Sequence, residues 1–84
     1  MRKRFLESEE LAINDQAGLE AATFAKEARA STGLSQRKFA KQARLGSNTI
    51  ATIEANTSPH PPRLNTLVKI ARGAGKRLKL SLAD

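Results

Sequence analysis

The chain has 84 residues, of which 39% are hydrophobic and only 4% aromatic, so it can build one small core and has no room for a second. It has no cysteine, which excludes a disulfide framework, a thiolate zinc site and a cysteine nucleophile. The net charge is +7. No apolar run approaches the roughly 20 residues that span a bilayer, and no signal-peptide pattern follows the basic start. We therefore expect a cytoplasmic protein.

The charge is distributed unevenly along the chain. Residues 1–20 carry three basic and five acidic groups, a net charge of −2, whereas residues 21–84 carry twelve basic and three acidic groups, a net charge of +9. A compact segment with such an excess has a strong positive field and suits a polyanion. The alternative is a lysine-rich surface that is merely solvated.

Residues 1–18 give mixed signals and are treated as an N-terminal extension that ends at Gly18. Arg2, Lys3 and Arg4 form a basic tip, and the larger aliphatic side chains that follow are Leu6, Leu11 and Ile13. A short helix, a strand and a flexible arm all fit this pattern. The basic tip could enter a DNA minor groove or be disordered.

Two helices are predicted next. From Leu19 the apolar residues follow helical spacing, and Gly33 can end this first helix. Ser35 is a suitable N-cap for a second helix over Gln36–Ala43. The residues expected to be buried are Ala21, Phe24, Ala25 and Ala28 in the first helix, and Phe39, Ala40 and Ala43 in the second.

Two further helices follow a break at Arg44–Gly46. The third covers Ser47–Ala55 with Ile50 and Ile53 facing inward, together with Leu45 from the turn. The stretch Asn56–Pro62 contains three prolines and is predicted to be a loop. In the fourth helix, which Gly73 and Gly75 stop, the helical spacing is carried by Leu64, Leu67, Val68 and Ala71.

The last segment, residues 76–84, has the period of a half-buried β-strand. Its three leucines, Leu78, Leu80 and Leu82, alternate with Arg77, Lys79 and Ser81. A lone strand needs a partner for its backbone edge, either the N-terminal segment or a second chain. This segment therefore favours a dimer.

A spaced set of residues resembles the helix-turn-helix of the Cro/C1 (Xre-type) repressor family over about residues 19–74. The set comprises Gly33-Leu34-Ser35-Gln36, Phe39-Ala40, Ile50 and Ile53-Glu54. The resemblance implies an all-α, lambda-repressor-like bundle that docks its third helix in the major groove of double-stranded DNA, usually as a dimer. We accordingly divide the chain into an extension (1–18), a helix-turn-helix domain (19–75) and a C-terminal strand (76–84).

The sequence departs from this family pattern at two places. Arg44 stands at the turn position where the family most often has glycine, and a left-handed conformation there would cost on the order of 1 kcal/mol relative to glycine. The loop Asn56–Pro62 is longer and richer in proline than the short family loop. Neither change falls on the docking surface that the resemblance implies.

The resemblance also implies roles for individual side chains. Those near the start of the third helix would project into the groove, and Asn48 is the best base reader because its amide can pair with adenine N6 and N7. Gln36 would touch the sugar-phosphate backbone and brace the third helix. The expected base readers are Ser47, Asn48, Thr49 and Thr52, and the expected phosphate contacts are Gln36, Arg37, Lys38, Arg44 and Arg63.

Some of these residues have structural alternatives. Asn48 and Thr49 could cap the third helix instead of reading bases. Arg37 and Lys38 could be ordinary solvated charges. Phe24 and Phe39, both already assigned to the core, are expected to pack inside rather than to stack on bases. His60 has no cysteine or second histidine near it, so no metal site and no cofactor are expected.

The C-terminal segment Gly75–Asp84 resembles the end of HipB and some HigA-like antitoxins. In those proteins a short strand pairs with its symmetry mate across a dimer, which would make Leu78, Leu80 and Leu82 the dimer interface. The alternative is a strand that folds back on its own chain. The resemblance implies the antitoxin of a type II toxin–antitoxin module, which represses its own operon at a palindromic operator and neutralises a toxin protein.

Three classes of function compete. An enzyme is not expected, because the inventory offers no acid–base pair or nucleophile constellation. A DNA-binding repressor, either an antitoxin or a stand-alone prophage-type regulator, fits the charge and the motif. A protein-interaction module without specific DNA binding would need an acidic partner for the basic surface. Steep salt dependence of binding would distinguish the repressor from the module.

Overall fold

The structure, a computed structural model, describes the backbone of residues 2–83 and the side chains of residues 9–83. Met1, Asp84 and the side chains of the basic tip, Arg2, Lys3 and Arg4, lie outside the described residues. The described chain forms four helices: α1 (Arg2–Ala30), α2 (Gln36–Gln42), α3 (Ser47–Ala55) and α4 (Leu64–Gly73). The all-α class is therefore confirmed. Within the described range no helix combines the length and apolarity needed to cross a membrane.

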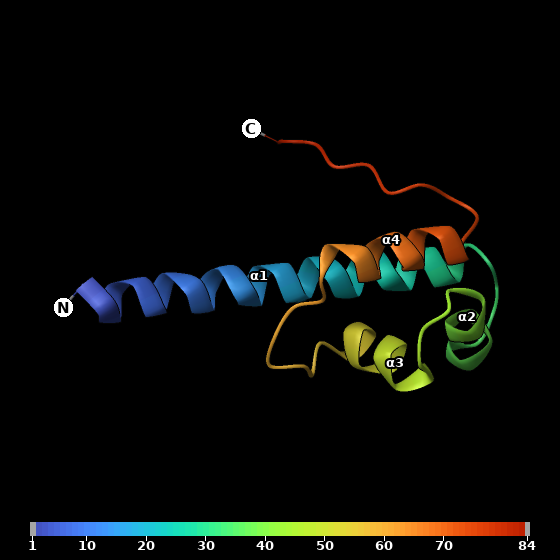
Figure 1. Ribbon diagram of the computed structural model, residues 1–84, viewed down its shortest axis with the longest axis horizontal. Helices are drawn as coiled ribbons and strands as arrows, with labels where there is room; N and C mark the ends of the chain where they lie inside the picture. The colour runs from blue at the N-terminus through green and yellow to red at the C-terminus, as the bar shows by residue number, and fades with distance from the viewer. Residues whose placement is uncertain (1, 84) are drawn as a thin grey trace.

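Helix α1 runs the length of the molecule, with α4 along its C-terminal part and α3 packed against it, while α2 packs against α3 and α4 (Figure 1). The helix predicted from Leu19 in fact begins at Arg2, so the backbone of residues 2–18 is helical. This stretch has no proline and is rich in good helix formers such as Leu, Glu and Ala. Leu11 and Ile13 are exposed there, because this part of α1 extends beyond the bundle.

Gly18 does not interrupt α1, although glycine in a helix interior costs helix stability. A β-carbon at Gly18 would lie 2.4 Å from Oδ1 of Asn56, which ends α3 in a left-handed conformation with φ 53°. Gly18 therefore allows the C-terminal end of α3 to approach α1 closely.

The predicted bounds of α3 are confirmed, and α2 begins at Gln36 as predicted but ends at Gln42, one residue earlier than predicted. The Ser35 side chain accepts a hydrogen bond of 3.2 Å from the Lys38 backbone N–H, as an N-cap should, and Gly33 has φ 71°. Ala43 is the C-cap of α2, one residue beyond its last helical residue.

The core is small and joins all four helices. Its largest fully buried side chains are Phe39, Ile50 and Ile70, and of these Ile70 was absent from the predicted core. Leu64, one of the residues that carry the helical spacing of the fourth helix, is exposed at the start of α4. The remaining buried hydrophobic residues are Ala21, Ala22, Ala25, Ala40, Ala43, Ile53 and Ala71, so the helices pack largely through alanine.

The C-terminal strand is not formed within this single chain. Residues 76–83 are extended without a strand partner, and the last backbone hydrogen bond that joins them to the bundle runs from Lys76 N–H to Ala71 O. Leu78 is half-buried, whereas Leu80 is 70% exposed and Leu82 fully exposed. An isolated extended segment has no ladder of hydrogen bonds to stabilise it.

Helices α2 and α4 approach most closely where Ala43 meets Gly73. A β-carbon at Gly73 would lie 2.8 Å from the Ala43 β-carbon and 3.0 Å from its α-carbon, and Gln42 Nε2 donates a 2.6 Å hydrogen bond to Gly73 O. The contact leaves no space for a side chain, because backbone atoms cannot rotate away.

We expect Gly73→Ala to lower the free energy of unfolding by about 1–3 kcal/mol, because the added methyl group forces α2 and α4 apart. Urea denaturation followed by circular dichroism measures this change. Gly46→Ala is the matched control, since Gly46 has φ −69° and only the Thr49 hydroxyl at 3.5 Å from an added β-carbon. Equal stability of the two variants would show that the α2–α4 contact is not tight.

Candidate nucleic-acid interface

Helix α3 presents its first turn to solvent while its opposite face is buried. Ser47, Asn48 and Thr49 are exposed, whereas Ile50 and Ile53 are buried in the core. The two isoleucines fix the rotation of the helix about its axis. The structure therefore places the polar leading end of α3 where a ligand as large as a duplex can reach it.

The polar side chains at the start of α3 do not cap the helix. Its N-cap is Gly46, and no side chain forms a hydrogen bond to the first-turn N–H groups. Thr52, which is half-buried, donates its hydroxyl to the Asn48 carbonyl within the helix. The amide of Asn48 and the hydroxyl of Thr49 form no hydrogen bond with the described residues, so both remain available to a ligand.

A groove of 410 Å³ separates the outer side of α3 from the loop before α4. Thr49 and Thr52 line one side, and Arg63, the N-cap of α4, lines the other. The proline loop adds the polar side chains of Ser58 and His60 to the same groove. The length and the prolines of this loop are visible in the sequence, but the position of Ser58 and His60 beside α3 is not.

The start of α2 lies next to α3 through one side-chain contact. Gln36 Nε2 donates a 3.3 Å hydrogen bond to Glu54 Oε1 on α3, while the neighbouring Arg37 and Lys38 are exposed. Gln36 is thus held in place from the side of α3, and the two cations beside it point to solvent.

Glu54 is the only polar residue among the buried side chains described, with 6% of its surface exposed. Arg29 of α1 donates to both of its oxygens, from Nε to Oε2 at 2.8 Å and from Nη2 to Oε1 at 3.0 Å. The third Arg29 contact is a 3.1 Å hydrogen bond from Nη1 to Leu34 O in the turn before α2. One ion pair therefore joins α1, α3 and the segment between α1 and α2.

The ion pair determines the protonation of both groups. The hydrogen bonds from Arg29 lower the pKa of Glu54, against the opposing effect of burial, and Gln36 adds a smaller effect of the same sign as Arg29. The same pairing raises the pKa of Arg29. The sequence patterns did not predict this network. The available signal was an acidic residue at position 54, on the apolar face defined by Ile50 and Ile53.

Arg44 lies apart from the groove. Its φ of 58° shows that Arg44 adopts the left-handed conformation for which the family most often has glycine. With Lys69 and Arg72 it lines a separate hollow of 420 Å³ between the end of α2 and the last turns of α4. Arg63 stands at the other end of α4, so the structure groups Arg63, but not Arg44, with the exposed side of α3.

A helix-turn-helix family model matches residues 26–80 of this chain. The matched range contains α2, the turn, α3 and α4 in full, together with the end of α1 and the first residues of the C-terminal segment. No curated protein and no solved structure matches the chain.

Acid should weaken the fold through Glu54. Because the folded-state pKa of this carboxyl is lowered, its contribution is complete above the ordinary value of about 4.3 and is lost as the pH falls through the folded-state pKa. We expect Glu54→Gln to flatten the fall in the free energy of unfolding below about pH 5. Urea titrations at stepwise pH measure this, with Glu10→Gln at an exposed position of α1 as control; identical slopes for both variants would refute the assignment.

Arg44→Gly should raise the free energy of unfolding by about 1 kcal/mol, because glycine adopts the left-handed conformation without a steric penalty. Thermal and urea denaturation of the variant test this. Asn56→Gly, at the other left-handed position, is the control and should gain less, since asparagine tolerates this conformation better than arginine. A loss of stability in Arg44→Gly would mean that the guanidinium contributes more than the backbone strain costs.

Proposed function

This chain belongs to the helix-turn-helix family of the Cro/C1 type, and from that premise we propose that it is a sequence-specific DNA-binding repressor whose α3 reads the major groove. Family membership supports a DNA-binding transcription regulator. The observation that carries the proposal is the exposed first turn of α3 above the buried Ile50 and Ile53. We propose that it acts in the cytoplasm on operator DNA, without a cofactor and without catalytic activity.

Base reading is assigned to the first turns of α3. Asn48 offers both a donor and an acceptor and can pair with adenine N6 and N7. Ser47 and Thr49 can bond to bases or phosphates through their hydroxyls. Thr52 uses its hydroxyl proton within the helix, so its methyl group is the part that can meet a thymine methyl group.

Phosphate binding is assigned to the cations that flank α3. Arg37 and Lys38 lie at the start of α2, where backbone N–H groups and the helix dipole also attract a phosphate. Arg63 lies across the groove from Thr49 and Thr52. The amide nitrogen of Gln36 donates one proton to Glu54 on α3, and its second N–H can donate to a phosphate oxygen of the duplex. Arg44 would contact a phosphate only at the margin of this surface.

We also propose that the repressor is a homodimer and the antitoxin of a type II toxin–antitoxin module that regulates its own operon. The exposed Leu80 and Leu82 on an extended segment support a protein partner for the C-terminus, as does the half-buried Leu78. A homodimer would bind a palindromic operator with half-sites about 34 Å apart or a multiple of it. A toxin that binds the antitoxin would be the second protein partner.

Fluorescence anisotropy with duplexes selected from the DNA upstream of the gene tests the function. Asn48→Ala should weaken specific binding by about 1–3 kcal/mol, roughly 5- to 150-fold, and leave non-specific binding unchanged. Asn14→Ala on α1 is the matched control. For Arg37→Ala we expect weaker binding to all sequences and a log–log salt slope that is less steep by about 0.9.

Two outcomes would contradict the proposal. Binding by the unsubstituted chain that does not weaken with salt would exclude a phosphate-contacting interface. Unchanged specificity in Asn48→Ala, with Arg37→Ala altering base preference instead, would show that the recognition surface lies elsewhere.

A further inference from the structure

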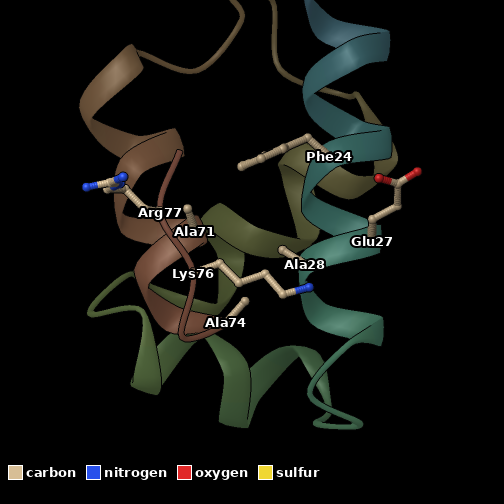
Figure 2. A pocket seen from close by; sticks show the side chains of 7 residues that line it. All are labelled: Phe24, Glu27, Ala28, Ala71, Ala74, Lys76 and Arg77. Carbon is tan, nitrogen blue, oxygen red and sulfur yellow. The ribbon is translucent and has the colours of Figure 1, made fainter. Parts of the chain in front are cut away.

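A hollow of 160 Å³ lies between α1 and α4 beside the start of the C-terminal segment (Figure 2). Phe24 and Ala28 of α1 and two alanines of the α4 end line it with apolar surface, and the side chain of Lys76 reaches across one end towards α1. The two alanines are Ala71 and Ala74.

A second hollow of 340 Å³ continues along the outer side of α1. It shares Phe24 and Glu27 with the first and adds Leu19, Glu20 and Thr23. We name the two together the α1–α4 groove. Its floor is apolar, with Leu19 exposed, and its outer edge carries two carboxylates.

The C-terminal segment has the complementary properties. Leu80 and Leu82 project into solvent from an extended backbone, and the charged side chains between the leucines are the basic Arg77 and Lys79. No backbone hydrogen bond from the described residues after Lys76 joins this segment to the bundle.

The spacing of the two surfaces matches. In an extended chain Leu78 and Leu82 lie about 13–14 Å apart with all three leucine side chains on one side. The groove follows α1 from Leu19 to Ala28, which at 1.5 Å per residue is also about 13–14 Å. The charges are also complementary: the groove carries the acidic Glu20 and Glu27, and the segment carries the basic Arg77 and Lys79.

We propose that the C-terminal segment of a second copy of this chain occupies the α1–α4 groove, each copy inserting Leu78, Leu80 and Leu82 into the other. This names the surface used by the dimer that is part of the proposed function. The chain's own segment begins at the groove, where Lys76 and Arg77 line it, but continues along α4 and leaves Leu80 and Leu82 in solvent (Figure 1). In a dimer with a two-fold axis, the segment of each copy fills the groove of the other, so the same interaction is made twice.

Disulfide trapping tests this exchange directly, because the chain has no cysteine of its own. Thr23→Cys places a thiol at the middle of the groove, and Leu80→Cys places one at the middle of the segment, so trapping does not depend on the direction of the segment. The two single variants are mixed without DNA and oxidised with diamide. A disulfide that joins one chain of each kind is necessarily intermolecular.

We expect the mixed disulfide to form at least tenfold faster than one between Leu80→Cys and Thr57→Cys, a control at an exposed position outside the groove. A product that joins only Leu80→Cys chains would show segments paired with each other away from the groove, which overturns the proposal. Equal rates with the Thr57→Cys control would overturn it as well.

Sedimentation equilibrium of the full chain provides the second measurement. Leu82→Ser and the charge reversal Glu27→Lys should each raise the dimer dissociation constant about tenfold or more, and Leu64→Ser, another exposed leucine, should leave it unchanged. A Leu82→Ser chain as dimeric as the unsubstituted one would refute the exchange. DNA binding of the unsubstituted chain, measured separately, decides whether the repressor function itself holds.

Discussion

The ion pair between Arg29 and Glu54 is the contact on which the arrangement of the other elements depends. It links residues 25 positions apart and, through Leu34 O and Gln36, brings together the end of α1, the start of α2 and the C-terminal half of α3. A buried ion pair adds little net stability, because desolvation of both charges offsets their attraction. The ion pair instead fixes the orientation of α3. Any rotation of α3 would leave the Glu54 carboxylate buried without its partner, so the residues proposed to read DNA are held in a fixed orientation relative to α1.

Small residues allow this arrangement in so short a chain. Ala40, Ala43 and Gly73 bring α2 and α4 together, and Gly18 admits the end of α3 to α1. Because their side chains at the contacts are small, the helix backbones approach closely and pack without the large buried side chains of a bigger domain. A core of this kind covers only part of the apolar surface, which explains why leucines remain exposed on α1 and on the C-terminal segment.

Sequence patterns predicted the elements that local signals define, and missed those that depend on distant partners. Ser35, Gly33 and the spacing of Phe39, Ile50 and Ile53 located α2 and α3. The N-terminal half of α1 was left open because Gly18 resembles a helix end unless its contact with Asn56 is known. The Arg29–Glu54 pair and the groove beside Ser58 and His60 arise from tertiary packing, and the predicted strand lacks the partner that a strand requires.

Under the proposed function, the chemistry of α3 calls for a second copy of the chain. Its polar leading residues are short: Ser47, Asn48 and Thr49 can each reach one base pair or phosphate, and the Thr52 hydroxyl proton is already used within the helix. One good bidentate contact discriminates by about 1–3 kcal/mol, whereas specific operators are bound about 4–10 kcal/mol more tightly than other DNA. A single α3 with one amide side chain falls short of that range. Two α3 helices on a palindrome double the contribution, so whatever surface joins the copies also determines whether the protein can select its site.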